Sequence, residues 1–298
     1  NFDTSNVTNM ISMFFGCANL SQLDVSNFDT SNVTNMDFMF SQCANLSQLD
    51  LSSFDTSNVT NMRYMFDDCE SLTQLDVSNF DTSNVTDITC MFSQCANLTQ
   101  LDVSNFDTSN VTSLAGMFAL CKNLTTLDLS NFDTSNVIDM SSMFYDCTSL
   151  TKLDISNFNT PKVWNNTNQI FFNTNNLNTI ILSQNISQEI LSSLSQNWYK
   201  LPDGTFYNSL FNSFDKSTIA GTYVKDFYAG IYAMWKEDTK TISIVSNEDA
   251  KKLEGNDYCR ISDLKSFIKK YNTKVKKLVR RILNGEKEKR KKFFKFLK

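Results

Sequence analysis

The hydrophobic positions in the first part of the chain recur every 26 residues. One phenylalanine returns at this interval without exception, at Phe2, Phe28, Phe54, Phe80, Phe106, Phe132 and Phe158. A cysteine keeps the same interval, at Cys17, Cys43, Cys69, Cys95, Cys121 and Cys147. Self-similarity at a fixed period of this length is typical of repeat proteins, in which a unit buries its apolar face only against its neighbours. The pattern therefore predicts a solenoid.

Within each unit the pattern predicts short extended segments joined by turns. In the first unit, residues 20–25 place apolar side chains two apart, which predicts a short strand. Residues 7–10 predict a second extended segment, and residues 13–17 predict one helical or 3₁₀ turn. The Asp-Thr-Ser-Asn segment, residues 3–6, predicts a turn without glycine, because Asp and Asn side chains bond neighbouring backbone groups.

The chain divides into three predicted parts. Residues 1–182 hold six full units and a degenerate seventh, which decays after Val163 and takes one inserted residue. Residues 183–258 predict a small β-rich or α+β module, with a short helix at 188–195 and a hairpin at 230–246. Residues 259–298 predict a basic amphipathic helix and tail. Because residue 1 is Asn and already lies inside a repeat, we expect a processed or truncated chain.

Charge is divided unevenly along the chain. Residues 260–298 hold 16 Lys and Arg against three acids, a balance of +13, whereas residues 1–259 hold 11 basic and 29 acidic residues, a balance of −18. The helix predicted at 261–283 has one apolar stripe and a basic face. It either docks on the preceding module or attaches to an anionic surface such as lipid, cell-wall polymer or nucleic acid. The candidate surface-binding residues are Lys269, Lys270, Lys274, Lys276, Lys277, Arg280 and Arg281.

The chain contains no histidine, which removes the commonest general base and metal ligand. Serine and cysteine hydrolases that depend on histidine are thereby excluded, and we expect no enzyme, cofactor or metal site. The repeated cysteines predict buried thiols in preference to disulfides, because parallel side chains point the same way. Two rows of aspartates, beginning at Asp24 and Asp29, either bind calcium or accept backbone N–H groups at their turns.

Positions that differ among the units are those that the core does not dictate. They are the eleventh, twelfth, fifteenth and sixteenth residues of each unit, and several carry aromatic or charged side chains. Exposed aromatics beside arginine are typical of binding hot spots, although drift on a solvated face gives the same pattern. The candidate ligand-binding residues are Phe15, Phe38, Arg63, Tyr64, Asp67, Asp68 and Tyr145.

The unit LSQLDVSNFDTSNVTNMDFMFSQCAN, which begins at Leu20, resembles the repeat of BspA-like leucine-rich-repeat surface proteins of bacteria. The likeness covers about residues 1–182, and residues 198–225 resemble the small module that often follows such repeats. The resemblance implies a leucine-rich-repeat-like solenoid on a secreted or surface-attached protein that functions in adhesion. We therefore expect an extracellular or cell-surface monomer that binds a protein or glycan on a host or neighbouring cell, without specific nucleic-acid recognition. The alternative is a scaffold attached to an anionic surface through its basic helix.

Overall fold

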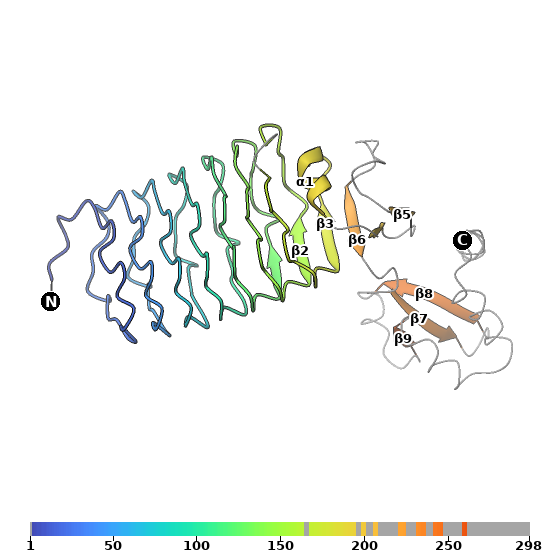
Figure 1. The fold of residues 1–298 in the computed structure, drawn as a ribbon, viewed down its shortest axis with the longest axis horizontal. Helices are drawn as coiled ribbons and strands as arrows, with labels where there is room; N and C mark the ends of the chain where they lie inside the picture. Colours follow the sequence, from blue (N-terminus) through green and yellow to red (C-terminus); the bar gives the residue numbers. More distant parts are fainter. Residues whose placement is uncertain are drawn as a thin grey trace. The chain divides into compact units, whose positions relative to one another are not determined.

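The computed structural model describes residues 2–163, 167–194, 198–200, 205–207, 220–224, 231–236, 241–246 and 258–260. Backbone contacts divide the chain into two compact units. The first comprises Asn1–Asn197 and Tyr207–Tyr223, and the second comprises Trp198–Phe206 and Val224–Lys298. The repeats lie in the first unit, where each 26-residue repeat forms one coil of backbone laid beside the next (Figure 1).

The coils are joined by rows of backbone hydrogen bonds in parallel register. Counting Asn1 as position 1, the N–H groups at positions 12, 14 and 16 donate to carbonyls of the following coil. In the first coil these bonds run from Ser12 to Asp37, from Phe14 to Met39 and from Gly16 to Ser41, at 2.8 to 2.9 Å. Parallel bridges at position 9 link six successive coils, from Asn9 to Asp139. This confirms the second extended segment predicted for each unit.

Positions 11 to 16 form consecutive turns, and neither the helical nor the 3₁₀ turn predicted at residues 13–17 is present. Met13 N–H bonds to the Met10 carbonyl, and the same three-residue step recurs from Phe15 and from Cys17. Positions 12 and 16 have positive φ in every coil, for example +56° at Phe38 and +60° at Asp68. A positive φ interrupts a right-handed helix, and it turns alternate N–H groups outward to the neighbouring coil.

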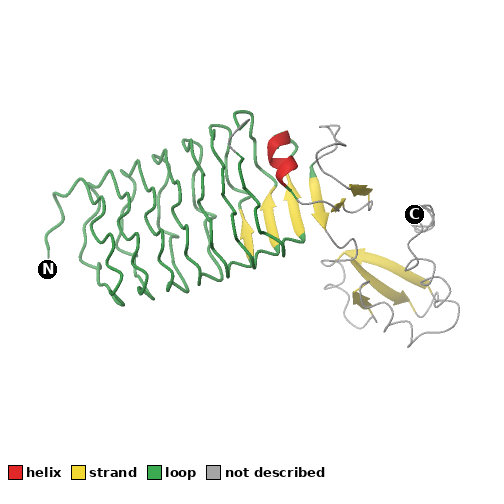
Figure 2. Cartoon of the chain, viewed as in Figure 1, coloured by secondary structure: helices red, strands yellow, loops and turns green. Residues whose placement is uncertain are grey.

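Strands form at the predicted Leu-x-x-Leu-Asp segment only in the later coils. These are β1 (Thr126–Asp128), β2 (Lys152–Ile155) and β3 (Thr179–Leu182), which pair in parallel (Figure 2). The corresponding segments of the earlier coils, beginning at residues 20, 46, 72 and 98, have no strand. The expectation of one strand per unit is therefore wrong for these coils.

Charge along this segment is similar where strands form and where they do not. Asp154 lies directly opposite Asp128 in the paired strands, and it lies opposite the uncharged Ile181 on its other side. Like charges on adjacent strands are destabilising, so the pairing of β1 with β2 carries the same carboxylate repulsion as the earlier coils. Bonds from Ser130 lower the pKa of Asp128, and the charge of Lys152 lowers it further.

The core is made of side-chain rows that run through the coils. Rings stack in sequence with centroids 5.4 to 6.1 Å apart, and they belong to Phe14, Phe40, Phe66, Phe92, Phe118, Phe144 and Phe171. Five thiols of the cysteine row are free and buried: Cys43, Cys69, Cys95, Cys121 and Cys147. Each donates to a phenylalanine carbonyl of the preceding coil at 3.0 to 3.3 Å. The prediction of buried thiols is confirmed for these five residues, whereas Cys17 is exposed.

After the last coil, Ser187 caps helix α1 (Gln188–Ser193), which confirms the short helix predicted there. Strand β6 (Gly221–Val224) lies next to β3 in the strand order. Strands β4 (Trp198–Lys200) and β5 (Thr205–Tyr207) are also neighbours in the strand order.

The second unit also contains the predicted hairpin. It is formed by β7 (Ile231–Lys236) and β8 (Thr241–Ser246), and β9 (Tyr258–Arg260) pairs with the other edge of β7. The helix predicted at 261–283 lies outside the described residues. The described fold is thus repetitive and poor in helix, and it contains a small sheet with parallel strands.

Candidate functional site

The candidate ligand-binding residues lie on one face of the coils, which we call the variable face. It consists of positions 11, 12, 15 and 16 of the turn segments, with position 15 buried at Ser41, Ser93 and Ala119. The amide rows at positions 12, 14 and 16 hold these segments in register. Phe15 is 47% exposed, and the six other candidates are partly exposed. Phe38, Tyr64 and Tyr145 are therefore accessible but only in part, because their rings stack on neighbours.

An aromatic cluster covers the first three coils of this face. The Phe15 ring meets the Phe38 ring edge-on with centroids 6.1 Å apart, and Phe38 stacks on Tyr64 at 4.7 Å. Phe38 and Tyr64 both stand at position 12, where φ is positive, so the backbone turn projects both rings from the same point of successive coils. The register of the coils thereby builds one apolar patch from three coils that carry different side chains.

Charged groups beside the cluster are held by specific partners. The Arg63 guanidinium lies 5.8 Å from the centroid of the Tyr64 ring, and its Nε is 3.6 Å from Asp87 Oδ2. Burial raises the pKa of Asp67 and of Asp68, and the Glu70 carboxylate raises that of Asp68 further. The rings of Phe38 and Tyr64 and the Arg63 guanidinium are thus held by contacts between successive coils.

Tyr145 belongs to a separate aromatic pair near the other end of the repeats. Its ring stacks on Phe172 with centroids 5.1 Å apart, and Phe172 is 53% exposed. Sequence reasoning missed Phe172, because the inserted residue of the seventh unit moves it out of the 26-residue alignment. Small side chains at Cys90 and Gly116 occupy position 12 of the coils between the two aromatic groups. The structure thus separates the predicted site into two patches.

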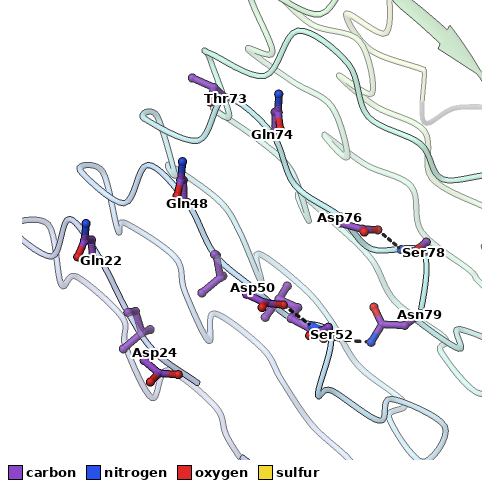
Figure 3. Close-up of a pocket in the computed structure, with 13 residues that line it drawn as sticks. Gln22, Asp24, Gln48, Asp50, Ser52, Thr73, Gln74, Asp76, Ser78 and Asn79 are labelled. Atoms are coloured by element: carbon purple, nitrogen blue, oxygen red, sulfur yellow. Dashed lines mark hydrogen bonds between the residues drawn. The ribbon is translucent and has the colours of Figure 1, made fainter. Parts of the chain in front are cut away.

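A polar groove lies on the Leu-Asp segments of the first three coils (Figure 3). Its volume is about 950 Å³, and one row of glutamines and one row of aspartates line it. The Oδ1 atoms of Asp50 and Asp76 accept the N–H groups of Ser52 and Ser78 at 2.9 Å. These bonds lower the pKa of both carboxyls. The prediction that the aspartates accept backbone N–H groups at their turns is confirmed, and these ionised carboxylates are unsuited to donating protons near neutral pH.

The described residues contain neither a metal site nor a membrane-spanning helix. Among them, no group of three or more His, Cys, Asp or Glu side chains is placed to hold a metal ion. No helix in the same part of the chain is long and apolar enough to span a membrane. The basic candidates from Lys269 to Arg281 lie outside the described residues.

Comparison with known protein families identifies the family of this chain. The family described as "Mycoplasma protein of unknown function, DUF285" matches residues 1–101 and 72–185. The two matches overlap, as expected when a repeated unit is aligned twice. No curated protein matches the chain. Since the matched residues make up more than half of the chain, the protein belongs to the DUF285 family.

Proposed function

We propose that this protein is a non-enzymatic binding protein whose variable face contacts another macromolecule at the cell surface or outside the cell. In this proposal the repeats form a leucine-rich-repeat-type solenoid of the BspA-like class. The buried leucine row that includes Leu46, Leu72 and Leu150, each with no exposed surface, supports that assignment. The partner is a protein or glycan on a host or neighbouring cell.

The observation that carries the proposal is the contrast between framework and variable positions. Met39, Phe40 and Cys43 of the second coil are fully buried, and their equivalents recur in every full unit or change conservatively. Phe38, two residues from Phe40, joins a partly exposed aromatic cluster beside an arginine. Aromatic and arginine side chains dominate the energetics of protein interfaces, so this cluster is the part of the face best suited to binding.

A triple variant tests the proposal. Phe38→Asn and Tyr64→Asn remove the rings and leave a residue that tolerates positive φ, and Tyr145→Ser removes the ring of the second patch. Binding is measured against a panel of immobilised extracellular-matrix proteins and glycans. We expect the variant to lose at least about tenfold in affinity for whichever member binds the parent protein.

The matched control changes three polar side chains on the groove instead, with Gln22→Ala, Gln48→Ala and Gln74→Ala. Melting temperatures of both variants should stay close to that of the parent protein, which separates lost contacts from lost folding. If the triple variant binds as tightly as the parent protein while the control does not, the variable face is not the binding surface.

A further inference from the structure

The aromatic cluster of the variable face lies in a strongly acidic part of the repeats. Residues 1–104, which form the first four coils, contain 12 Asp and one Glu, whereas Arg63 is their only basic residue. Bonds from serines lower the pKa of turn aspartates in these coils, such as Asp50 and Asp76, so these carboxylates are ionised at neutral pH. A surface with such an excess of negative charge repels anionic partners and attracts cationic ones.

Three carboxylates beside the rings lack a counter-charge. They belong to Asp67, Asp68 and Glu70, which follow Tyr64 within six residues in the third coil. Burial raises the pKa of Asp67 and of Asp68, because both carboxylates have lost part of their hydration. Among the described residues, no Lys or Arg forms an ion pair with any of the three. A cationic partner would supply the charge that these groups lack.

Arg63 is engaged with other carboxylates. Its Nε is 3.6 Å from Asp87 Oδ2, and its backbone N–H donates to Asp37 Oδ1 at 3.0 Å. The guanidinium also lies 5.8 Å from the centroid of the Tyr64 ring. The face thus already holds one cation beside a ring and a carboxylate, which is the arrangement that favours cationic side chains at aromatic surfaces.

Arginine and lysine side chains match both parts of this surface. Their apolar stems pack on rings while their charged heads reach polar groups. The rings of Phe38 and Tyr64, stacked with centroids 4.7 Å apart, provide the apolar part. A metal ion matches the surface less well, since no three His, Cys, Asp or Glu side chains of the described residues are placed to hold one. Carboxylates spread along a turn instead suit several cations carried on one chain.

We propose that the rings of Phe38 and Tyr64, together with the carboxylates of Asp67, Asp68 and Glu70, bind a segment of a protein partner that is rich in arginine and lysine. This inference rests on the proposed function, and it narrows the partner from a protein or glycan to a basic protein segment. Anionic glycans and other polyanions are repelled by the same charges.

Two variants of the 298-residue chain with equal net charge test the proposal. The site variant carries Asp67→Asn, Asp68→Asn and Glu70→Gln. The matched control carries Asp24→Asn, Asp50→Asn and Asp76→Asn on the polar groove. Asparagine can accept the same turn bonds as aspartate, and it tolerates the positive φ at Asp68. Circular dichroism checks that both variants fold.

Fluorescence anisotropy measures the binding of two short labelled peptides, in which serine alternates with arginine or with glutamate. The site variant should bind the arginine peptide about tenfold more weakly than the parent protein, because it loses three partly exposed ion pairs. The control should lose less than about threefold, because it loses the same charge but no direct contact. Equal losses in the two variants would overturn the proposal, since binding would then follow net charge alone. Equal affinity of the parent protein for the glutamate peptide would overturn it too.

A single substitution gives a second measurement that does not depend on buried groups. Glu70 is exposed, so Glu70→Lys reverses one charge of the site without changing the core. It should weaken binding of the arginine peptide by about fivefold. Unchanged binding by this variant would contradict the proposal.

The ring variant, Phe38→Asn with Tyr64→Asn, separates this inference from the proposed function. It should bind the arginine peptide at least about tenfold more weakly. If the ring variant loses a matrix protein or glycan that the site variant still binds, the variable face binds a partner but the basic segment is wrong. If both variants bind every partner as the parent protein does, the proposed function fails as well.

Discussion

Substitution of Gly116 by alanine tests how tightly the turn segments of neighbouring coils pack. Gly116 stands at position 12 with φ of +61°, and a Cβ atom there would lie 2.6 Å from Cys90 Sγ. Two effects should destabilise the variant. One is the cost of positive φ for a residue with a side chain, and the other is the contact with the thiol of the preceding coil.

The two contributions have different magnitudes. Ser142, Cys90 and Tyr64 occupy the same position with φ of 54 to 56°, so the backbone accommodates side chains there at a cost of about 1 to 2 kcal/mol. Carbon and sulfur atoms pack at about 3.5 to 4.0 Å, so a contact at 2.6 Å forces a shift. Overpacking of this kind costs about 1 to 3 kcal/mol. Together the two effects predict a loss of about 2 to 5 kcal/mol in the free energy of unfolding.

A double-mutant cycle separates the two effects. Cys90→Ala removes the sulfur atom and with it the contact, so in that background Gly116→Ala should cost only the backbone contribution of about 1 to 2 kcal/mol. Urea unfolding followed by circular dichroism gives the free energy of unfolding of all four proteins. Cys90→Ala also removes the side-chain hydrogen bond between Cys90 and Tyr64, but this loss is the same with and without Gly116→Ala and cancels in the cycle. An equal cost of Gly116→Ala with and without the thiol would refute the packing explanation.

Three further predictions follow from charge and burial. Bonds from Ser57 to Asp55 lower the pKa of that carboxyl, and the corresponding serines lower the pKa values of Asp29, Asp81 and Asp107, so these folded pKa values lie below the unfolded ones. The stability they contribute is present at neutral pH and should be lost as the pH falls through about 4 towards 2, and a melting temperature unchanged over that range would contradict this. Burial raises the pKa of the Cys43 thiol to about 11 and that of Cys121 to about 12. Alkylation of the folded protein at pH 8 should therefore label Cys17 long before either of them. In urea the three thiols should react at similar rates. If the basic tail attaches the protein to a surface, deletion of residues 260–298 should abolish binding to anionic vesicles. Binding of the parent protein to these vesicles should weaken as salt is added. Vesicle binding that survives the deletion would exclude the tail as the attachment site.

The period of 26 residues could be predicted because burial imposes it. The positions equivalent to Phe40 and Cys43 are buried in every interior coil, and a core that varied there would not stack. The Asp-Thr-Ser-Asn turn could also be predicted, since its geometry depends on bonds between residues two apart, such as Ser57 N–H to Asp55. Local chemistry of this kind is contained in the sequence of one unit.

Features that depend on contacts between units were predicted less well. Phe38 and Tyr64 adopt positive φ, a conformation that turn statistics assign to Gly and Asn, because the amide rows of neighbouring coils impose it. The early coils form no strand although their Leu-x-x-Leu-Asp segments match those of the later coils, so the sequence of one unit does not determine whether strands pair. The pairing of Tyr145 with Phe172 follows an insertion that the period alone does not locate.

The amide rows at positions 12, 14 and 16 also give the stack of coils an electrical polarity. In each row the N–H groups point towards the following coil and the carbonyls towards the preceding one, from Ser12 through to Asp146. The row at position 10, from Met10 to Asn35 and onward, runs the same way, whereas the row at position 8, from Thr34 to Thr8 and onward, runs the opposite way and offsets part of the sum. Peptide dipoles of about 3.5 D therefore add along the axis as they do in an α-helix, with a negative pole at the first coil. Cations are stabilised near that pole and anions near the other, and salt weakens both effects.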